Sequence, residues 1–377
     1  MTMTVEEILS KKEFDSFSRI IESTISPRLL HNPKLKLNEL EEIEDYFGRQ
    51  LNGYEREITK FATFEQLEIK EKCRIVVTIA AYKEEKNIEN TLAQLSKQDI
   101  DKSFFEVIIL DNHPEKDKRD NTRERVLEFK QHNPSISIVY VYKTFGEGEC
   151  HIGNIRKFVS DIALKRISHL KNKNKGTVIV NLDADLIDLQ SNYLSSILKA
   201  FDTKGGIDCL TTSSHMPKDL RMKPNLYVPL LFWELLDEVF LSGEYFPKIE
   251  RTKEPFFMIM GGHSAYRASI YAAVGGYYEK TDVGEDTDLG AFIAHARGWK
   301  SSSIIRFSKA KAYYSKRRFL LSLAENTPLF AAGLMFSDNK KRKDLINLNE
   351  LQILNMLSDD FDINTSSGTL YWSAMDT

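Results

Sequence analysis

Short apolar segments alternate with helical segments along the middle of this chain. Apolar segments cover residues 75–80, 106–110 and 136–142, a fourth ends at Asp183, and helical patterns lie between them over residues 84–96, 122–131 and 152–170. Apolar runs without polar alternation are typical of strands that are buried on both faces. Strands that alternate with helices predict an α/β fold with a mostly parallel sheet flanked by helices.

The 377 residues suffice for one large α/β domain with extensions, or for two domains. Residues 1–70 are charged and show helical spacing, which predicts a helical N-terminal extension. We place the α/β domain at residues 71–335 and a polar, helical C-terminal tail at residues 336–377. Within the domain the pattern loosens after about residue 200, where we expect strands over residues 207–212 and 256–260 and helices over residues 227–240, 268–274 and 286–296.

The composition excludes several classes of protein. A net charge of −3 gives no reason to expect nucleic acid as a partner. The three cysteines (Cys73, Cys150 and Cys209) lie far apart, form no metal-binding spacing and fit a reducing compartment. Acidic residues or proline interrupt the apolar stretches at residues 226–241 and 319–336. We therefore expect a cytoplasmic protein without a transmembrane segment, with peripheral membrane association as an alternative.

Asp183 and Asp185 stand at the end of the fourth apolar segment. The carboxyl edge of an open α/β sheet is where such folds bind ligands. Carboxylate oxygens suit Mg²⁺ or Mn²⁺, which usually bridges to phosphate oxygens. The alternative is purely structural, with Asp185 or Asp188 capping a helix that contains Tyr193 and Leu194.

Four separated blocks then follow one another in the order of a known family. They are VVTIAAYKEEKNI at residues 76–88, VIILDN at residues 107–112 with DNT at residues 120–122, the turn at residues 183–185, and GGHSAYR, VGGY and GEDTDL between residues 261 and 289. A weaker fifth block is SKRRF at residues 315–319. From residue 74 to about residue 320 the chain resembles family-2 glycosyltransferases of the GT-A fold, whose sheet is Rossmann-like.

This resemblance implies a metal-dependent, inverting glycosyltransferase. It would move a sugar from a nucleotide diphosphate donor, expected to be UDP-linked, to the hydroxyl of a glycan, a lipid-linked or protein acceptor, or a small molecule. The alternatives are a retaining transferase on the same fold and a noncatalytic relative that binds a glycan or a partner. A sugar nucleotidyltransferase needs a Gly-rich basic loop after the first strand, and residues 81–84 do not form one.

The resemblance also implies how the donor is held. Asp111 would accept a hydrogen bond from the imide N–H of a uracil or thymine ring, with Ala81 and Tyr82 beside the same base. Asp185 would coordinate Mn²⁺ or Mg²⁺. Asp183 would face the ribose or the sugar hydroxyls and contact the metal through water.

The later blocks supply the remaining predicted site residues. Asp286 would be the general base that deprotonates the acceptor, and Glu285 would hold the sugar or the acceptor. Acidic residues are also favoured in the first turn of any helix, which is the structural alternative for both. The other members of the predicted site are Gly261 and Gly262 beside the donor sugar, Arg317 and Arg318 at the diphosphate, and His263 as a candidate.

Two positions depart from the family pattern. Phe292 stands where the family often has arginine after its Glu-Asp pair. Gly153, within HIGN at residues 151–154, stands where the family's ARN segment has its arginine. We therefore expect other residues to make the donor contacts of these two arginines.

Overall fold

The computed structural model describes residues 38–63, 68–114, 118–146, 148–170, 176–203, 206–215, 259, 262–280, 285–297 and 303–315. Its helices are α2 (Glu39–Gly48), α3 (Tyr54–Ala62), α4 (Ile88–Ser96), α5 (Thr122–His132), α6 (Ile152–Ser168), α7 (Tyr193–Thr203), α9 (Ala268–Ala273) and α10 (Glu285–Ala296). Its strands are β1 (Ile75–Ala81), β2 (Phe105–Pro114), β3 (Ser137–Phe145), β4 (Val178–Asp183), β5 (Leu186–Leu189), β6 (Cys209–His215), β7 (His263–Arg267) and β8 (Ile304–Tyr314). The helix predicted at residues 227–240, nearly all of the strand predicted at residues 256–260, and the C-terminal tail lie outside the described residues.

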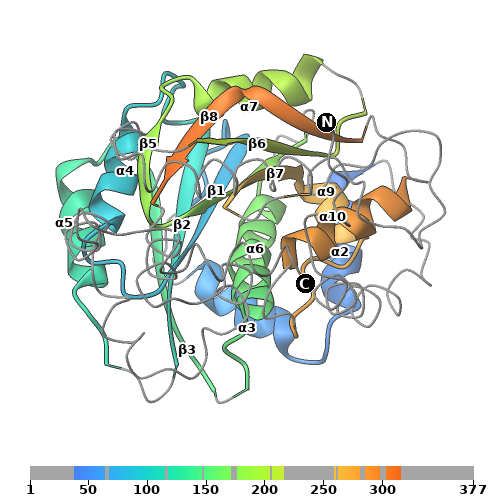
Figure 1. Cartoon of the computed structure of the whole chain (residues 1–377). Coiled ribbons are helices and arrows are strands. Elements are labelled where there is room, and N and C mark those ends of the chain that lie inside the picture. The colour runs from blue at the N-terminus through green and yellow to red at the C-terminus, as the bar shows by residue number, and fades with distance from the viewer. Residues whose placement is uncertain are drawn as a thin grey trace, which may run out of the picture.

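The described strands form one sheet in the order β3-β2-β1-β4-β7-β6-β8-β5 (Figure 1). The first four are parallel neighbours, as the alternation of apolar and helical segments predicted. β7 runs antiparallel to both β4 and β6, β8 is parallel to β6, and β5 is antiparallel to β8. The predicted α/β fold with a mostly parallel sheet is therefore confirmed.

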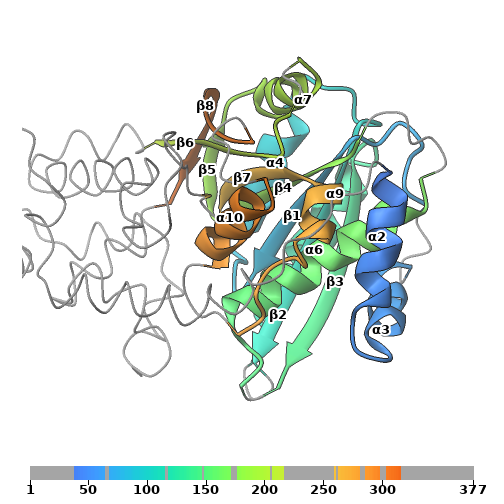
Figure 2. The same ribbon diagram turned by 90° about the vertical axis from the view of Figure 1, so that its right-hand side faces the viewer.

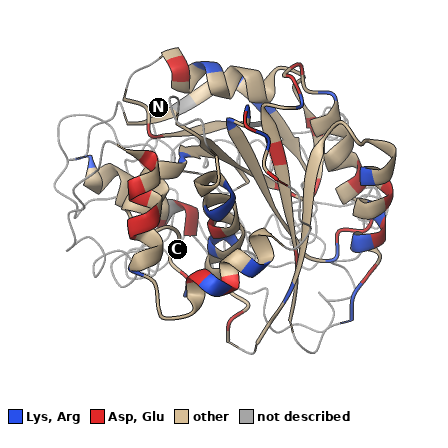
Figure 3. Ribbon diagram, turned by 180° about the vertical axis from the view of Figure 1, so that it is seen from behind, with Lys and Arg blue, Asp and Glu red and all other residues tan. Residues whose placement is uncertain are grey.

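Helices cover both faces of the sheet (Figures 1 and 2). One hydrophobic core lies between the sheet and α2, α3, α6, α9 and α10, and the other between the sheet and α4, α5 and α7. Neighbouring residues of a strand belong to opposite cores, as Ile108 and Ile109 of β2 do. Figure 3 shows the charged residues mainly on helices and loops, while the strands are largely uncharged.

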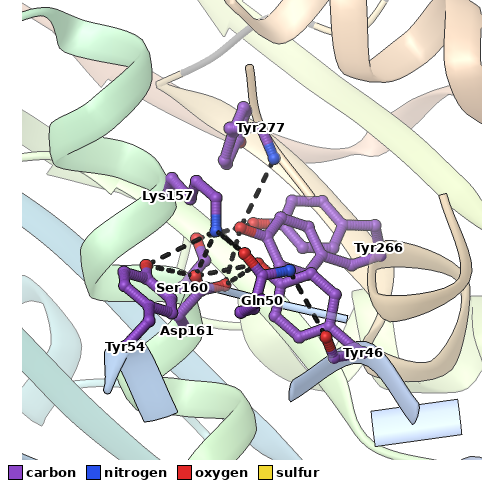
Figure 4. Close-up of polar contacts among 9 residues, drawn as sticks. Tyr46, Gln50, Tyr54, Lys157, Ser160, Asp161, Tyr266 and Tyr277 are labelled. Carbon is purple, nitrogen blue, oxygen red and sulfur yellow. Dashed lines mark hydrogen bonds and ion pairs between the residues drawn. The ribbon is translucent and has the colours of Figure 1, made fainter. Parts of the chain in front are cut away.

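A buried ion pair joins α6 to the N-terminal helices (Figure 4). Lys157 Nζ lies 2.8 Å from Asp161 Oδ2, one helical turn away. Tyr46 of α2 donates to Asp161 at 2.8 Å, Tyr54 of α3 donates at 2.6 Å, and Tyr271 of α9 donates at 3.2 Å. Burial, and then the charge of Asp161, raises the pKa of Tyr54 and of Tyr271, so both hydroxyls remain donors. These bonds satisfy a charge that would otherwise be costly to bury.

A second set of hydrogen bonds leads from α6 to β4. Ser160 and the Tyr266 hydroxyl lie 3.1 Å apart, and Asn181 of β4 donates to Tyr266 at 3.3 Å. Asn181 also donates to the Tyr277 hydroxyl and accepts from Thr78 of β1. Asn181 lies two residues before Asp183 in β4. Its hydrogen bonds therefore fix the strand that leads into the Asp-x-Asp turn.

The segment after the Asp-x-Asp turn differs from the capping alternative. Asp185 lies in the turn between β4 and β5, and Asp188 lies within β5, where its Oδ1 accepts from the Leu189 amide at 2.9 Å. The proposed helix cap at Asp185 or Asp188 was therefore wrong. The reason is tertiary: β5 pairs with β8, a strand from the far end of the described chain.

None of the helices that the structure describes is long and apolar enough to cross a bilayer. The two interrupted apolar stretches, at residues 226–241 and 319–336, lie outside the described part of the chain.

We predict that Lys157→Met destabilises the protein by about 3–5 kcal/mol, because it leaves the Asp161 carboxylate buried without its cation. The matched control is Lys165→Met on the same helix. Lys165 Nζ lies 2.6 Å from Glu55 Oε1, and the Glu55 side chain is half exposed. Exposed pairs contribute about 1 kcal/mol or less. Urea unfolding measures both, and equal losses would contradict the prediction.

Candidate active site

Three neighbouring strands reach the carboxyl edge of the sheet: β1 and β4 end there, and β2 continues to Pro114. In the register of the sheet, Ala81 at the end of β1 pairs with Asp111 of β2, and Ala80 pairs with Asp183 of β4. Asp111 and Asp183 therefore flank the end of β1 from its two sides. Ala81 is fully buried, and the neighbouring Tyr82 is partly exposed.

Asp183 lies directly against the backbone of Gly262. A Cβ atom at residue 262 would be 2.1 Å from Asp183 Oδ2 and 2.6 Å from its Cγ. The Gly262 carbonyl accepts a hydrogen bond from the Tyr314 hydroxyl of β8. Residue 262 is therefore a glycine for a specific steric reason, which is the close approach of the Asp183 carboxylate.

Arg156 of α6 connects two of the predicted site residues, although none of the sequence motifs pointed to it. Its Nη2 donates to Asp183 Oδ1 at 3.1 Å, and its Nε lies 2.9 Å from Glu285 Oε1. The Nε is buried and is not aligned for a hydrogen bond. One signal was present in the sequence: Arg156 follows Gly153 by three residues, and residues at that spacing share one face of a helix.

Glu285 begins α10 and is almost fully buried. Burial is the largest influence and raises the pKa of Glu285 to about 7, although the positive charge of Arg156 opposes it. The neighbouring charges of Asp286 and Asp183 raise this pKa further. Near neutral pH the Glu285 carboxyl can therefore take up or release a proton, as acid–base catalysis requires. Asp286 follows it and is partly exposed.

The Asp-x-Asp turn suits a hard cation if a bound ligand supplies the remaining coordinating oxygens. Asp183 and Asp185 are both partly exposed, and Asp183 Oδ2 is the oxygen that Arg156 does not bind. Among the described residues, no group of three or more His, Cys, Asp or Glu side chains could hold a metal ion. Mg²⁺ commonly binds through one or two carboxylates together with substrate phosphates. The residues present therefore fit a cation that is completed by a nucleotide.

Asp111 is buried and already hydrogen-bonded. The Tyr140 hydroxyl donates to its Oδ2 at 2.5 Å, and His113 Nε2 lies 2.8 Å from its Oδ1. An ionised carboxylate offers about four acceptor positions, so two protein donors leave capacity for a further one. The Tyr82 ring is edge-on to the His113 ring at 5.8 Å between centroids, so His113 contacts both Tyr82 and Asp111.

His113 was not anticipated in this region. It replaces a small residue of the family segment, is almost fully buried, and its Nδ1 makes no hydrogen bond. Its ring centroid lies 5.7 Å from that of Tyr142, and the Arg119 guanidinium is 3.3 Å from the Tyr142 ring centroid. Around Asp111, β2 supplies His113, the neighbouring β3 supplies the Tyr142 ring, and Arg119 lies over that ring.

The remaining predicted residues fall into two groups. His263 is buried in β7, its ring centroid is 5.7 Å from that of Tyr314, and its carbonyl accepts from Thr212 at 2.9 Å. Gly261, Arg317 and Arg318 lie outside the described residues.

A sequence model described as "Glycosyltransferase like family 2" matches residues 73–310. No curated protein matches the chain. Among solved structures, the mannosyltransferase PcManGT from Pyrobaculum calidifontis in complex with GDP-Man and Mn²⁺ is 13% identical, with a TM-score of 0.45 over 96% of this chain and 97% of that one. S. aureus TarS 1-349 in complex with UDP is 16% identical, with a TM-score of 0.41 over 80% and 74%. Glucosyl-3-phosphoglycerate synthase from Mycobacterium tuberculosis, with Mn²⁺, UDP and phosphoglyceric acid, is 13% identical, with a TM-score of 0.38 over 75% and 84%.

The raised pKa of Glu285 predicts a pH-dependent stability. Its ordinary pKa is 4.5 and its folded-state pKa is about 7, so between these values the folded protein binds more protons than the unfolded chain. The free energy of unfolding should therefore fall as the pH rises from about 4.5 to about 7, by about 1.4 kcal/mol per unit of pKa difference. Glu285→Gln should remove this part of the dependence in urea unfolding. The exposed control Glu128→Gln should keep it, and identical pH profiles for the two variants would refute the prediction.

We also predict that Gly262→Ala displaces the Asp183 carboxylate, because the new methyl group would overlap it. The affinity for UDP with Mn²⁺ should fall about tenfold or more, which corresponds to about 1.4 kcal/mol. Gly48→Ala is the control, since a methyl group added at residue 48 would meet no atom within 4 Å. Calorimetry measures the affinities and circular dichroism checks the fold. Unchanged binding in Gly262→Ala would mean that Asp183 is not part of the donor site.

Proposed function

This chain belongs to the glycosyltransferase-like family 2 and is a glycosyltransferase; we propose that it transfers a sugar from a UDP-linked donor to an acceptor hydroxyl with inversion, and that a divalent cation assists. The observation that carries the proposal is the arrangement around Arg156. One guanidinium contacts both Asp183 at the strand end and Glu285 at the start of α10. Two motifs that are distant in sequence therefore meet at the ligand-binding edge of the sheet.

The donor would bind along the ends of β1, β2 and β4. Asp185 would hold the cation, with Asp183 as its neighbour, and the nucleotide phosphates would complete the coordination. When bound, the cation neutralises the diphosphate leaving group. Asp111 would accept the imide proton of uracil, and Tyr82 would lie beside the base.

In the proposed chemical step, the acceptor hydroxyl gives its proton to a residue at the start of α10. Asp286 would accept the proton of the acceptor hydroxyl as its oxygen attacks the anomeric carbon. The bond from that carbon to the diphosphate oxygen breaks at the same time, so the configuration inverts. Asp286 suits this role because it is partly exposed, whereas Glu285 is buried and would hold the sugar or the acceptor from beneath.

The acceptor would be a glycan, a lipid-linked or protein acceptor, or a small molecule. A retaining transferase on the same fold would need no such base. The anomeric configuration of the product separates the two mechanisms.

The test begins with binding. Calorimetry of UDP, GDP, CDP and ADP, each with and without Mn²⁺, should show that UDP binds most tightly and that Mn²⁺ strengthens the binding. Asp185→Asn should abolish the effect of Mn²⁺. A purine nucleotide at the head of the ranking would overturn the uracil assignment, and equal Mn²⁺ dependence in Asp185→Asn would overturn the cation site.

Asp286→Asn separates chemistry from binding in the same assay. Turnover of a nucleotide-sugar donor should fall by about a hundredfold to ten-thousandfold, the usual contribution of general base catalysis. The affinity for UDP should change little, since the base acts on the acceptor. A parallel loss of both would make Asp286 a donor ligand instead.

A further inference from the structure

We infer that Arg156 is a positioning residue that acts as the resident cation of the donor site. It holds the Asp-x-Asp turn and the first turn of α10 in one arrangement, and it competes with a divalent cation for Asp183. This inference rests on the proposed function for the identity of the ligand, a nucleoside diphosphate.

The first argument is geometric. Arg156 belongs to α6, Asp183 to the end of β4 and Glu285 to the start of α10, so one side chain joins three elements. Its side chain is only 13% exposed, which limits the competition of water for these contacts. Charge-assisted contacts of this kind are stronger than neutral hydrogen bonds.

The second argument is the balance of charge. Burial alone would lower the pKa of Arg156, but the neighbouring charges of Glu285 and Asp183, and then of Asp286, outweigh it and raise this pKa. Like-charged carboxylates at such a site repel one another, and a guanidinium offsets that repulsion without ever losing its proton. Removing the guanidinium would therefore leave the Asp183 carboxylate without its cationic partner.

The third argument is the rigidity of the support. The next residue, Lys157, lies in the buried cluster with Asp161 and Tyr46. Ser160, one turn further along α6, is hydrogen-bonded to Tyr266. The backbone that carries Arg156 is therefore held by buried contacts of the residues that follow it in α6.

The fourth argument concerns what the guanidinium still offers. Arg156 Nη2 is used by Asp183, whereas the buried Nε–H has no aligned acceptor. A buried donor without a hydrogen bond carries an unrecovered desolvation cost. Nε already faces Glu285 Oε1 at 2.9 Å, so a phosphate would meet another part of the guanidinium, whose planar fork suits phosphate groups.

Opposite changes in two affinities follow from these contacts. Without Arg156, Asp183 Oδ1 becomes available and the site more negative, so Mn²⁺ alone should bind more tightly. A nucleoside diphosphate should bind more weakly, because it loses a cationic partner and an ordered site. A residue that served only the stability of the fold would lower both affinities together.

The experiment uses the full chain and the variants Arg156→Gln and Arg156→Lys. Electron paramagnetic resonance measures the affinity for Mn²⁺ alone, and calorimetry measures the affinity for UDP at saturating Mn²⁺. We expect Arg156→Gln to bind Mn²⁺ about threefold or more tightly and UDP about tenfold or more weakly. Arg156→Lys keeps the charge but loses the fork, so its Mn²⁺ affinity should stay near wild type while UDP binding falls in part.

Arg297→Gln is the matched control. Arg297 contacts Asp208 at 2.5 and 2.7 Å, near the end of the sheet opposite to Asp183. This variant should lower the free energy of unfolding without changing either affinity. Affinities in Arg156→Gln that stay unchanged, or that move in the same direction, would overturn the inference even if wild type binds UDP. Failure of wild type to bind any nucleoside diphosphate would overturn the proposed function and the inference with it.

Discussion

The buried pair of Lys157 and Asp161 is the interaction on which the rest of the structure depends. It lies on α6, which covers one face of the sheet, and it is satisfied by hydroxyls from α2, α3 and α9. Two charges buried together are stable only when their remaining hydrogen-bonding capacity is filled. The cluster thus makes the N-terminal helices a structural requirement for the interior, since they supply the Tyr46 and Tyr54 hydroxyls.

The same helix serves the site on another of its faces. Arg156 precedes Lys157 in the sequence, and its guanidinium contacts Asp183 and Glu285. The buried cluster of Lys157 and Asp161 and the candidate site are therefore linked through one helix, α6. The glycine at residue 262 leaves space for the Asp183 carboxylate. In the candidate site, the positive charge of the buried Arg156 offsets the negative charges of the carboxylates around it.

The sequence predicted what depends on local pattern. The strands that became β1 to β4 were recognisable because each is built around a run of apolar residues, which is typical of strands buried on both faces. Parallel pairing then brought Asp111 and Asp183 to one edge, as expected. The pairing of β5 with β8 and the contact of Arg156 with Glu285 were not predictable in this way, because both involve residues from the last part of the described chain. His113 was missed because its importance lies in a hydrogen bond to Asp111 and a ring contact with Tyr82, which no sequence spacing reveals.

The long sequence separation between Arg156 and Glu285 has a consequence for synthesis. A ribosome adds about 5–20 residues per second, so Arg156 and Asp183 exist for several seconds before Glu285 is made. β8, which borders both β5 and β6, is added later still. During that interval the first four strands can pair, while the guanidinium lacks one of its carboxylates and the sheet lacks a strand. The site is thus among the last parts of the described chain to form. A nascent chain released before α10 is made would carry the Asp-x-Asp turn and Arg156 but would lack Glu285 and Asp286.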